Sequence, residues 1–298
     1  IFPSRSETDD NKKDFNQVGI LGKPNAGKST YFNAILKDKR SIVSSTPGTT
    51  RDAISELTSF KGIELKITDT AGLRKKSKVN DEIEKSSVNQ AIKTMRASEG
   101  IIYLIDGKES ISDQDLHLIS LSISSGKPLV IGINKSETLD KYEKTTIRRD
   151  LNRRLAFAKD LDIKYISAKN KYGTSALISN ILSLIRKSKE VLNPKFVNKV
   201  FLDAYEKNPP PMIGRFRPKI KFVKNLDVQP PTFIIHGNKI ESLSKQYLKY
   251  LENYIRNPLQ LKGIPIKLVL KTAENPYKTR KNRLTKRQLE KRKRIRRR

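Results

Sequence analysis

Short apolar runs alternate with stretches of helical periodicity from residue 16 to about residue 190. The runs predict strands at 18–21, 63–68, 101–105, 129–133 and 165–167. The periodic stretches predict helices at 29–37, 82–96, 113–124, 144–160 and 174–188. Strands that alternate with helices favour a parallel sheet covered by helices on both faces. Functional residues are then expected on the loops that follow the carboxyl ends of the strands.

A second pattern begins after Asn193-Pro194. It predicts a helix at 195–206, strands at 219–224 and 232–236, a helix at 241–256 and a strand at 264–270. The order α-β-β-α-β indicates a small α+β layer. The predicted organisation is therefore a polar linker or tail at 1–15, an α/β domain at 16–190, an α+β domain at 193–272 and a basic tail at 273–298.

Charge is unevenly distributed along this chain of 298 residues with a net charge of +31. Residues 193–298 hold 28 basic and 7 acidic side chains, against 34 and 24 in residues 1–192. This large excess of basic residues in the C-terminal part favours binding to a polyanion, and RNA is the usual one. The alternatives are a basic surface that is only solvated and a surface that binds an anionic membrane. Cysteine is absent, which excludes disulfides and thiolate metal sites. No apolar run approaches the length of a membrane span.

The strand predicted at 18–21 leads directly into a glycine-containing loop. The loop reads Gly22-Lys23-Pro24-Asn25-Ala26-Gly27-Lys28-Ser29. A strand, a G-x-x-x-x-G-K-S loop and a helix in this order form a P-loop, in which backbone N–H groups surround a phosphate. In such a loop Lys28 reaches the β- and γ-phosphates, and the Ser29 hydroxyl can ligate Mg²⁺.

Four further nucleotide-binding motifs follow in order. They are Thr49-Thr50-Arg51-Asp52, Asp69-Thr70-Ala71-Gly72, Asn134-Lys135-Ser136-Glu137 and Ser167-Ala168-Lys169. The first supplies a threonine hydroxyl to Mg²⁺, and the second an aspartate for Mg²⁺ and an amide that senses the γ-phosphate. The last two follow predicted strands and would frame a guanine base. Each motif alone is weak evidence, but five in order at strand ends predict a guanine-nucleotide site.

These motifs resemble those of the translation-factor-related GTPases, and within them the Der/EngA family of ribosome-assembly GTPases. Supporting stretches are Asn25, Gly48-Thr49-Thr50-Arg51-Asp52, Asp69-Thr70-Ala71-Gly72-Leu73-Arg74, Ile111-Ser112-Asp113-Gln114-Asp115-Leu116, Pro230 to Asn238, Tyr247 to Leu251 and Glu274-Asn275-Pro276-Tyr277. Family members have two successive GTPase domains and then a KH-like domain. The resemblance, from about 16 to 298, covers the second GTPase domain onward. It implies a P-loop GTPase domain with a mostly parallel sheet, a small α+β KH-like domain and a basic tail.

The resemblance also implies roles for individual residues. Lys28, Thr50 and Gly72 would be catalytic; Ser29, Thr50 and Asp69 would hold Mg²⁺, and Asn25 would be one ligand of a K⁺ ion. The GTP-binding residues would be Gly22, Lys23, Pro24, Asn25, Ala26, Gly27, Lys28, Ser29, Thr30, Asp69, Thr70, Ala71, Gly72, Leu73, Asn134, Lys135, Ser136, Glu137, Ser167, Ala168 and Lys169.

Three departures from related patterns bear on function. Leu73 stands where Ras-like proteins place the glutamine that orients water, so no side chain there can position the attacking water. The resemblance implies that a K⁺ ion near the phosphates does the charge work of an arginine finger. Glu137 replaces the family's aspartate, which sets its carboxylate one methylene further from the backbone and puts guanine discrimination in question. The C-terminal domain lacks the G-x-x-G loop with which KH domains clamp nucleic acid, so it could instead pack on the GTPase domain and relay its state.

The function implied is GTP hydrolysis in assembly of the large ribosomal subunit. The partners would be GTP and GDP, rRNA, the large-subunit precursor and other assembly factors, with no membrane. The compartment would be the bacterial cytoplasm or an organelle matrix; because the chain begins with Ile1 and not with Met, a targeting segment or an upstream GTPase domain could have preceded it. The alternative is an rRNA scaffold that binds nucleotide but hydrolyses it weakly or not at all. A tRNA-modification GTPase also uses Asn25 and T-T-R-D, but such enzymes carry the GTPase within a helical domain.

Overall fold

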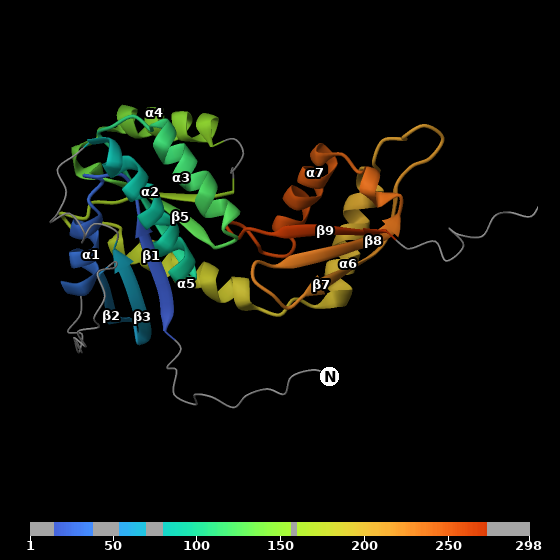
Figure 1. The fold of residues 1–298 in the computed structure, drawn as a ribbon, viewed down its shortest axis with the longest axis horizontal. Helices are drawn as coiled ribbons and strands as arrows, with labels where there is room; N and C mark the ends of the chain where they lie inside the picture. Colours follow the sequence, from blue (N-terminus) through green and yellow to red (C-terminus); the bar gives the residue numbers. More distant parts are fainter. Residues whose placement is uncertain (1–14, 38–53, 70–79, 156–159, 273–298) are drawn as a thin grey trace, which may run out of the picture.

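The computed structural model describes residues 15–37, 54–69, 80–155 and 160–272. Two lobes follow one another along the longest axis, a larger one up to residue 189 and a smaller one from residue 194 (Figure 1). Among the described residues, no helix is both long and apolar enough to cross a bilayer.

The larger lobe is built on a six-stranded sheet of order β2-β3-β1-β4-β5-β6. Its strands are β1 (Asn16–Leu21), β2 (Ile54–Phe60), β3 (Ile63–Asp69), β4 (Gly100–Asp106), β5 (Leu129–Asn134) and β6 (Asp162–Tyr165). All neighbours are parallel except the edge strand β2, which runs antiparallel to β3. The mostly parallel sheet confirms the predicted α/β class. Strand β1 lies between β3 and β4, where the strand order reverses, so the loop after β1 opens into the crevice used by ligands.

Helices cover both faces of this sheet. They are α1 (Lys28–Lys37), α2 (Asn80–Ala97), α3 (Asp113–Ser124), α4 (Lys141–Arg154) and α5 (Thr174–Lys189). The central strand β4 shows how the core divides, because all seven of its residues are buried. Its Ile102 and Leu104 pack with α1 and α5, whereas Ile101 and Tyr103 pack with α2, α3 and α4.

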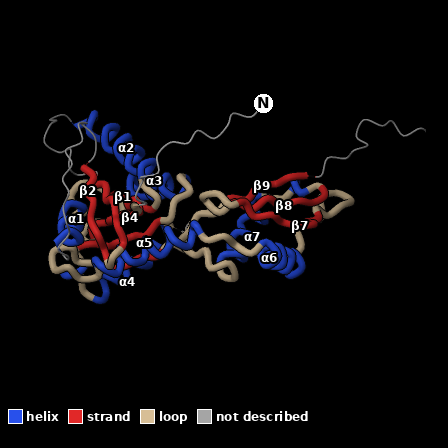
Figure 2. Tube along the Cα trace, turned by 90° about the horizontal axis from the view of Figure 1, so that it is seen from below, coloured by secondary structure: helices blue, strands red, loops and turns tan. Residues whose placement is uncertain are grey.

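The smaller lobe is a three-stranded sheet with helices on one side. Its elements are α6 (Pro194–Lys207), β7 (Lys219–Leu226), β8 (Thr232–Asn238), α7 (Lys245–Arg256) and β9 (Lys267–Thr272). Strand β8 is central, antiparallel to β7 and parallel to β9. Helices α6 and α7 lie on the same side of the sheet (Figure 2). Phe201 of α6 packs on Phe233 of β8 with ring centroids 5.3 Å apart.

Side chains from both lobes meet between them. Nε of Arg256 in α7 forms an ion pair with Oδ2 of Asp160 at 3.0 Å. Nδ2 of Asn225 donates to the carbonyl of Leu192, in the segment that joins α5 to α6. Gly263 lies against Leu184 of α5 in a left-handed conformation, φ +72°, and a Cβ there would sit 3.2 Å from the leucine side chain.

Two predictions in the larger lobe differ from the structure. The sequence analysis predicted no strand at β2. In the structure, Lys61 and Gly62 both have positive φ and form the tight turn that joins β2 to β3. The strand expected at 165–167 lies earlier, at β6, and Ser167 instead pairs with Tyr172 in an isolated bridge.

Two predicted helices have different bounds because of their caps. The helix expected at 144–160 is α4, which starts at Lys141 because Asp140 and Glu143 form a capping box, and which ends at Arg154. The helix expected at 241–256 is divided. A 3₁₀ turn, Ile240–Ser242, precedes α7, whose start is fixed by the Ser244 hydroxyl accepting from the Tyr247 amide.

Candidate nucleotide-binding site

The loop between β1 and α1 has the backbone that a P-loop requires. Gly22 has φ +146°, and a Cβ on it would lie 2.3 Å from the Leu104 carbonyl oxygen. Gly27 has φ +87°, and a Cβ there would lie 2.1 Å from the Asn134 side chain. Both positions therefore need glycine. Asn25, between them, adopts the left-handed conformation at φ 67°, which asparagine tolerates better than most residues.

Lys28, the first residue of α1, folds back over the loop. Its Nζ donates to the carbonyl oxygens of Gly22 at 2.8 Å and Lys23 at 2.7 Å, and the residue is buried. The ammonium group is thus held at the N-terminus of α1, where amides and helix dipole favour an anion. Ser29 and Thr30 are exposed in the first turn of α1, so their hydroxyls are accessible beside that amine.

Asn134, the last residue of β5, joins three segments of the candidate site. Its Nδ2 donates to the Ala26 carbonyl and its Oδ1 accepts from the Ala168 amide, both at 2.9 Å. The Ser136 amide adds a bond to the Ile166 carbonyl at 3.1 Å. The P-loop and the loops after β5 and β6 are thereby fixed to one another. Ser167 and Ala168 are buried, whereas Lys169 and Glu137 are exposed at the rim.

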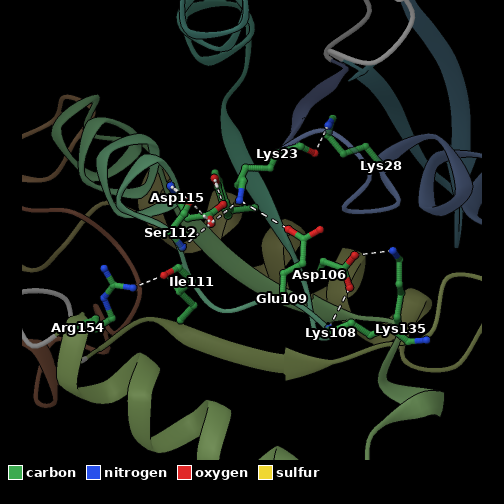
Figure 3. A network of polar contacts seen from close by, with 11 residues as sticks. Lys23, Lys28, Asp106, Lys108, Glu109, Ile111, Ser112, Asp115, Lys135 and Arg154 are labelled. Carbon is green, nitrogen blue, oxygen red and sulfur yellow. Dashed lines mark hydrogen bonds and ion pairs between the residues drawn. The ribbon is translucent and has the colours of Figure 1, made fainter. Parts of the chain in front are cut away.

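Lys135 lies beside Asn134 and faces the end of β4. Its Nζ makes an ion pair with Oδ2 of Asp106, and Oδ1 of that carboxylate accepts from the Lys108 amide at 3.0 Å (Figure 3). Asp106 is buried and was not singled out from the sequence, although a carboxylate that directly follows an apolar strand marks such a position.

A second network, also missed in the sequence reading, ties the P-loop to α3 (Figure 3). Nζ of Lys23 lies 3.9 Å from Oδ2 of Asp115 and 3.6 Å from Oε2 of Glu109. Asp115 is buried and accepts from the Tyr103 hydroxyl at 2.9 Å and from the Ser112 amide and hydroxyl at 3.0 and 2.7 Å. Burial, together with the Asp115 charge, raises the pKa of Tyr103 well above its ordinary value. The capping-box spacing of Ser112 and Asp115 was the available signal.

Several residues expected at the γ-phosphate lie outside the part of the chain that the structure describes. Thr50, Thr70, Ala71, Gly72 and Leu73 lie outside the described residues, as does the side chain of Asp69, whose backbone ends β3. Of the expected Mg²⁺ ligands, Ser29 fits, because its exposed hydroxyl adjoins the loop and Mg²⁺ prefers oxygen donors. Elsewhere among the described side chains, no group of three or more acidic or histidine residues could hold a metal.

A cavity of about 880 Å³ lies apart from the P-loop, between the loop that follows β4 and helix α4. Its lining includes Glu109, Tyr142 and Arg153 but no P-loop residue. We therefore identify the nucleotide site from the backbone conformation of the P-loop and from the hydrogen bonds of Asn134, and not from the position of this cavity.

Two family models match the chain. Residues 17–135 match the family described as 50S ribosome-binding GTPase, and residues 192–271 match the KH-domain-like C-terminal domain of EngA bacterial GTPase enzymes. GTPase Der of Nitrosococcus oceani is 39% identical over 279 residues, which is 94% of this chain and 60% of that protein. The chain belongs to the Der/EngA family. GTPase Der of Methylococcus capsulatus is 34% identical over 99% of this chain and 64% of that protein. The chain thus spans about three fifths of the length of these Der proteins.

Similar folds occur among solved structures. An Era variant of Aquifex aeolicus bound to GDP and AlF₄⁻ has a TM-score of 0.46 and 23% identity, covering 87% of this chain and 93% of that one. Era in complex with MgGDPNP and nucleotides 1506–1542 of 16S ribosomal RNA has a TM-score of 0.45 and 24% identity, covering 87% and 92%.

Proposed function

We propose that this protein binds GTP and hydrolyses it to GDP and phosphate. The observation that carries the proposal is the pair of bonds made by Asn134, which fixes the loops expected to read the base against the P-loop. Membership of the Der/EngA family supports the same activity. A site whose parts are already fixed in place does not have to be ordered when the nucleotide binds.

The residues of the loop would act on the phosphates. Lys28 and the loop amides would bind the β- and γ-phosphates and offset charge that develops as water attacks the γ-phosphorus and the bond to the bridging oxygen breaks. Ser29, with Thr50 and Asp69, would hold Mg²⁺, which supplies neutralisation of the phosphate charge. Lys135 and Glu137 would frame the base, with Asp106 positioning the lysine amine.

Hydrolysis should be slow for the isolated protein and faster in K⁺ than in Na⁺. Leu73 offers no group to orient water, and Asn25, in its left-handed turn of the P-loop, would help to hold a K⁺ ion at the phosphates. Turnover of GTP is measured in each salt for the wild-type and Asn25→Ala proteins. The salt preference should vanish in the variant, and equal wild-type rates in K⁺ and Na⁺ would remove the K⁺ mechanism.

We further propose that the protein acts in assembly of the large ribosomal subunit and docks on rRNA through residues 193–298. The excess of 28 basic over 7 acidic residues in that half supports this docking. The matching family is described as 50S ribosome-binding, which favours the large subunit. Co-sedimentation with large-subunit particles, measured with GTP, GDP and a non-hydrolysable analogue, tests the proposal. Binding that depends on the nucleotide is expected; absence of binding under all three conditions would contradict it.

The second candidate is a scaffold that binds rRNA and nucleotide with little or no turnover. Leu73 favours it because it offers no group to orient water, and Glu137 favours it because its carboxylate lies one methylene further from the backbone than the family's aspartate. The same particle assay separates the two functions when hydrolysis is followed in parallel. A scaffold would sediment equally with every nucleotide, and the particle would not accelerate GTP hydrolysis.

A further inference from the structure

The sheet of the smaller lobe has one face that helices do not cover. Helices α6 and α7 pack on its other side, where Ile220, Val223, Phe233 and Ile235 are almost fully buried (Figure 2). The side chains that alternate with these point away from the helices. Six of them form what we call the open sheet face: Phe222, Lys224, Ile234, His236, Val269 and Lys271.

Strand register arranges these six residues in two rows. Phe222, His236 and Lys271 are aligned across β7, β8 and β9, and Lys224, Ile234 and Val269 are aligned in the neighbouring row. The rows are two residues apart along each strand, or about 7 Å. Each row therefore presents apolar surface with a lysine at one end.

Phe222 and His236 form a stacked aromatic pair on this face. Their ring centroids are 4.4 Å apart and their planes differ by 13°. Phe222 nevertheless keeps 40% of its surface exposed, which is unusual for a phenylalanine in the middle of a strand. Burial and the adjacent Lys224 and Lys271 amines hold the pKa of His236 below its ordinary value, so its ring is neutral at pH 7.

The cations of the open sheet face have no acidic partner among the described residues. Neither Lys224 nor Lys271 takes part in a described ion pair, and Nζ of Lys224 lies 5.9 Å from the Phe222 ring centroid. An occupant that satisfies this surface must be anionic and must present flat apolar groups. The chain's own residues 273–298, with 13 basic and 2 acidic side chains, would be repelled from it.

We propose that the open sheet face binds single-stranded RNA by stacking a base on Phe222, with Lys224 and Lys271 contacting the flanking phosphates. An acidic protein surface could use the amines but would leave the aromatic ring exposed to water. Single-stranded RNA satisfies both, because its bases are free to stack and its phosphates lie on either side. Duplex RNA keeps its bases stacked inside the helix.

The open sheet face would provide the RNA contact that the G-x-x-G loop provides in other KH domains. The domain lacks the G-x-x-G loop by which KH domains clamp an RNA backbone. The proposal rests on the rRNA docking proposed above and specifies which surface of the smaller lobe makes it.

Fluorescence anisotropy of the full chain with a labelled 12-nucleotide unstructured RNA tests the proposal. Phe222→Ala should weaken binding by roughly five- to a hundredfold, the range for losing one stacked base. Phe222→Tyr should bind as the wild type does. Phe196→Ala is the matched control, because Phe196 is 47% exposed but lies on α6, away from the face, and its removal should change nothing.

The salt dependence of RNA affinity, and binding to an RNA strand without bases, separate the contribution of base stacking from that of the lysine charges. Phe222→Ala should lower the affinity equally at every salt concentration, whereas Lys224→Ala and Lys271→Ala should each flatten the log–log slope by about 0.7. On an abasic RNA of equal length, Phe222→Ala should have no effect. Lys224 and Lys271 are exposed, so their alanine variants should fold and can still test the proposal if Phe222→Ala does not fold.

The outcomes distinguish this proposal from the one on which it rests. Wild-type protein that binds neither the RNA nor large-subunit particles would contradict the rRNA docking itself. Strong RNA binding that is unchanged in Phe222→Ala would overturn the open sheet face alone. A loss in Phe222→Ala of particle binding without loss of oligonucleotide binding would also overturn it, and would make the face a protein-docking surface.

Discussion

Asn134 shows at the scale of one residue what the sequence could and could not predict. The motif Asn134-Lys135-Ser136-Glu137 after an apolar strand was enough to place this asparagine at the end of β5. The partner of its Nδ2, the Ala26 carbonyl, lies 108 residues away along the chain. Contacts at such separation follow from strand order, which local periodicity does not contain. The same holds for Lys135, which follows β5, and Asp106, which ends β4.

Replacing Asn134 should therefore affect the fold as well as nucleotide binding. Asn134→Ala removes two hydrogen bonds and leaves the Ala26 carbonyl and the Ala168 amide without their partner, at a cost of about 1–3 kcal/mol for each buried group. Asn134→Asp keeps an acceptor for the Ala168 amide but sets a buried carboxylate oxygen against the Ala26 carbonyl, so it should also lose stability. Urea unfolding and titration with fluorescent GDP measure the two effects. A stable Asn134→Ala protein with wild-type affinity would show that the loops are held by other contacts.

Glu137 is expected to read the base from the rim of the site. It lies exposed in the short 3₁₀ turn Ser136–Thr138, with its carboxylate one methylene further from the backbone than an aspartate would place it. Glu137→Asp should tighten GDP binding and Glu137→Ala should weaken it about tenfold or more, since a hydrogen bond to a charged group contributes roughly 1.5–3 kcal/mol. Titration with fluorescent GDP measures both affinities. A Glu137→Ala protein that binds GDP as tightly as the wild type would mean that Glu137 does not contact guanine.

At the scale of elements, apolar periodicity located β1, β3, β4 and β5 of the parallel part of the sheet, but it placed β6 too late and missed the edge strand β2. Strands buried on both faces read as continuous apolar runs, as β4 does, and these stand out in a sequence. The sequence of β2, Ile-Ser-Glu-Leu-Thr-Ser-Phe, spaces its apolar residues three apart and has no strand-like alternation. The shifted starts of α4 and α7 came from caps, Asp140 and Ser244, that periodicity does not weigh.

The Tyr103–Asp115 bond, which joins β4 to α3, should make stability depend on alkaline pH. The pKa of Tyr103 is raised in the fold, so the phenol stays protonated there while the unfolded chain ionises above about pH 10. The free energy of unfolding should therefore fall as pH rises past that value. Tyr103→Phe should cost about 1 kcal/mol at pH 7 and make the alkaline decline less steep. Urea unfolding from pH 8 to 11 measures both.

A matched control separates this effect from general alkaline denaturation. Tyr142 is 77% exposed on α4, so Tyr142→Phe should leave both the stability at pH 7 and the alkaline slope unchanged. Equal slopes for Tyr103→Phe and the wild type would contradict a phenol held protonated by the fold.

At the scale of the whole molecule, one continuous apolar core runs from α1 and α5 into the smaller lobe. The sequence placed a break at Asn193-Pro194, where α6 begins with Asn193 as its cap. It gave no sign that Leu184 would pack against Gly263 or that Arg256 would pair with Asp160, because both contacts depend on how the two sheets face each other. The two lobes therefore share part of one core and an ion pair, through which a change at the nucleotide site would reach the half that we propose docks on rRNA.

The basic C-terminal tail should anchor the protein to rRNA independently of nucleotide chemistry. Residues 273–298 carry 13 basic and 2 acidic side chains. Each phosphate of single-stranded RNA that they engage should steepen the fall of affinity with salt by about 0.7 log units per log unit. Removing residues 275–298 should therefore weaken particle binding and flatten the salt slope, while GTP hydrolysis stays near the wild-type rate. The open sheet face predicts the opposite signature for Phe222→Ala, a loss of affinity at unchanged slope. A truncated protein that binds the particle with the full slope would place the electrostatic contact elsewhere on the molecule.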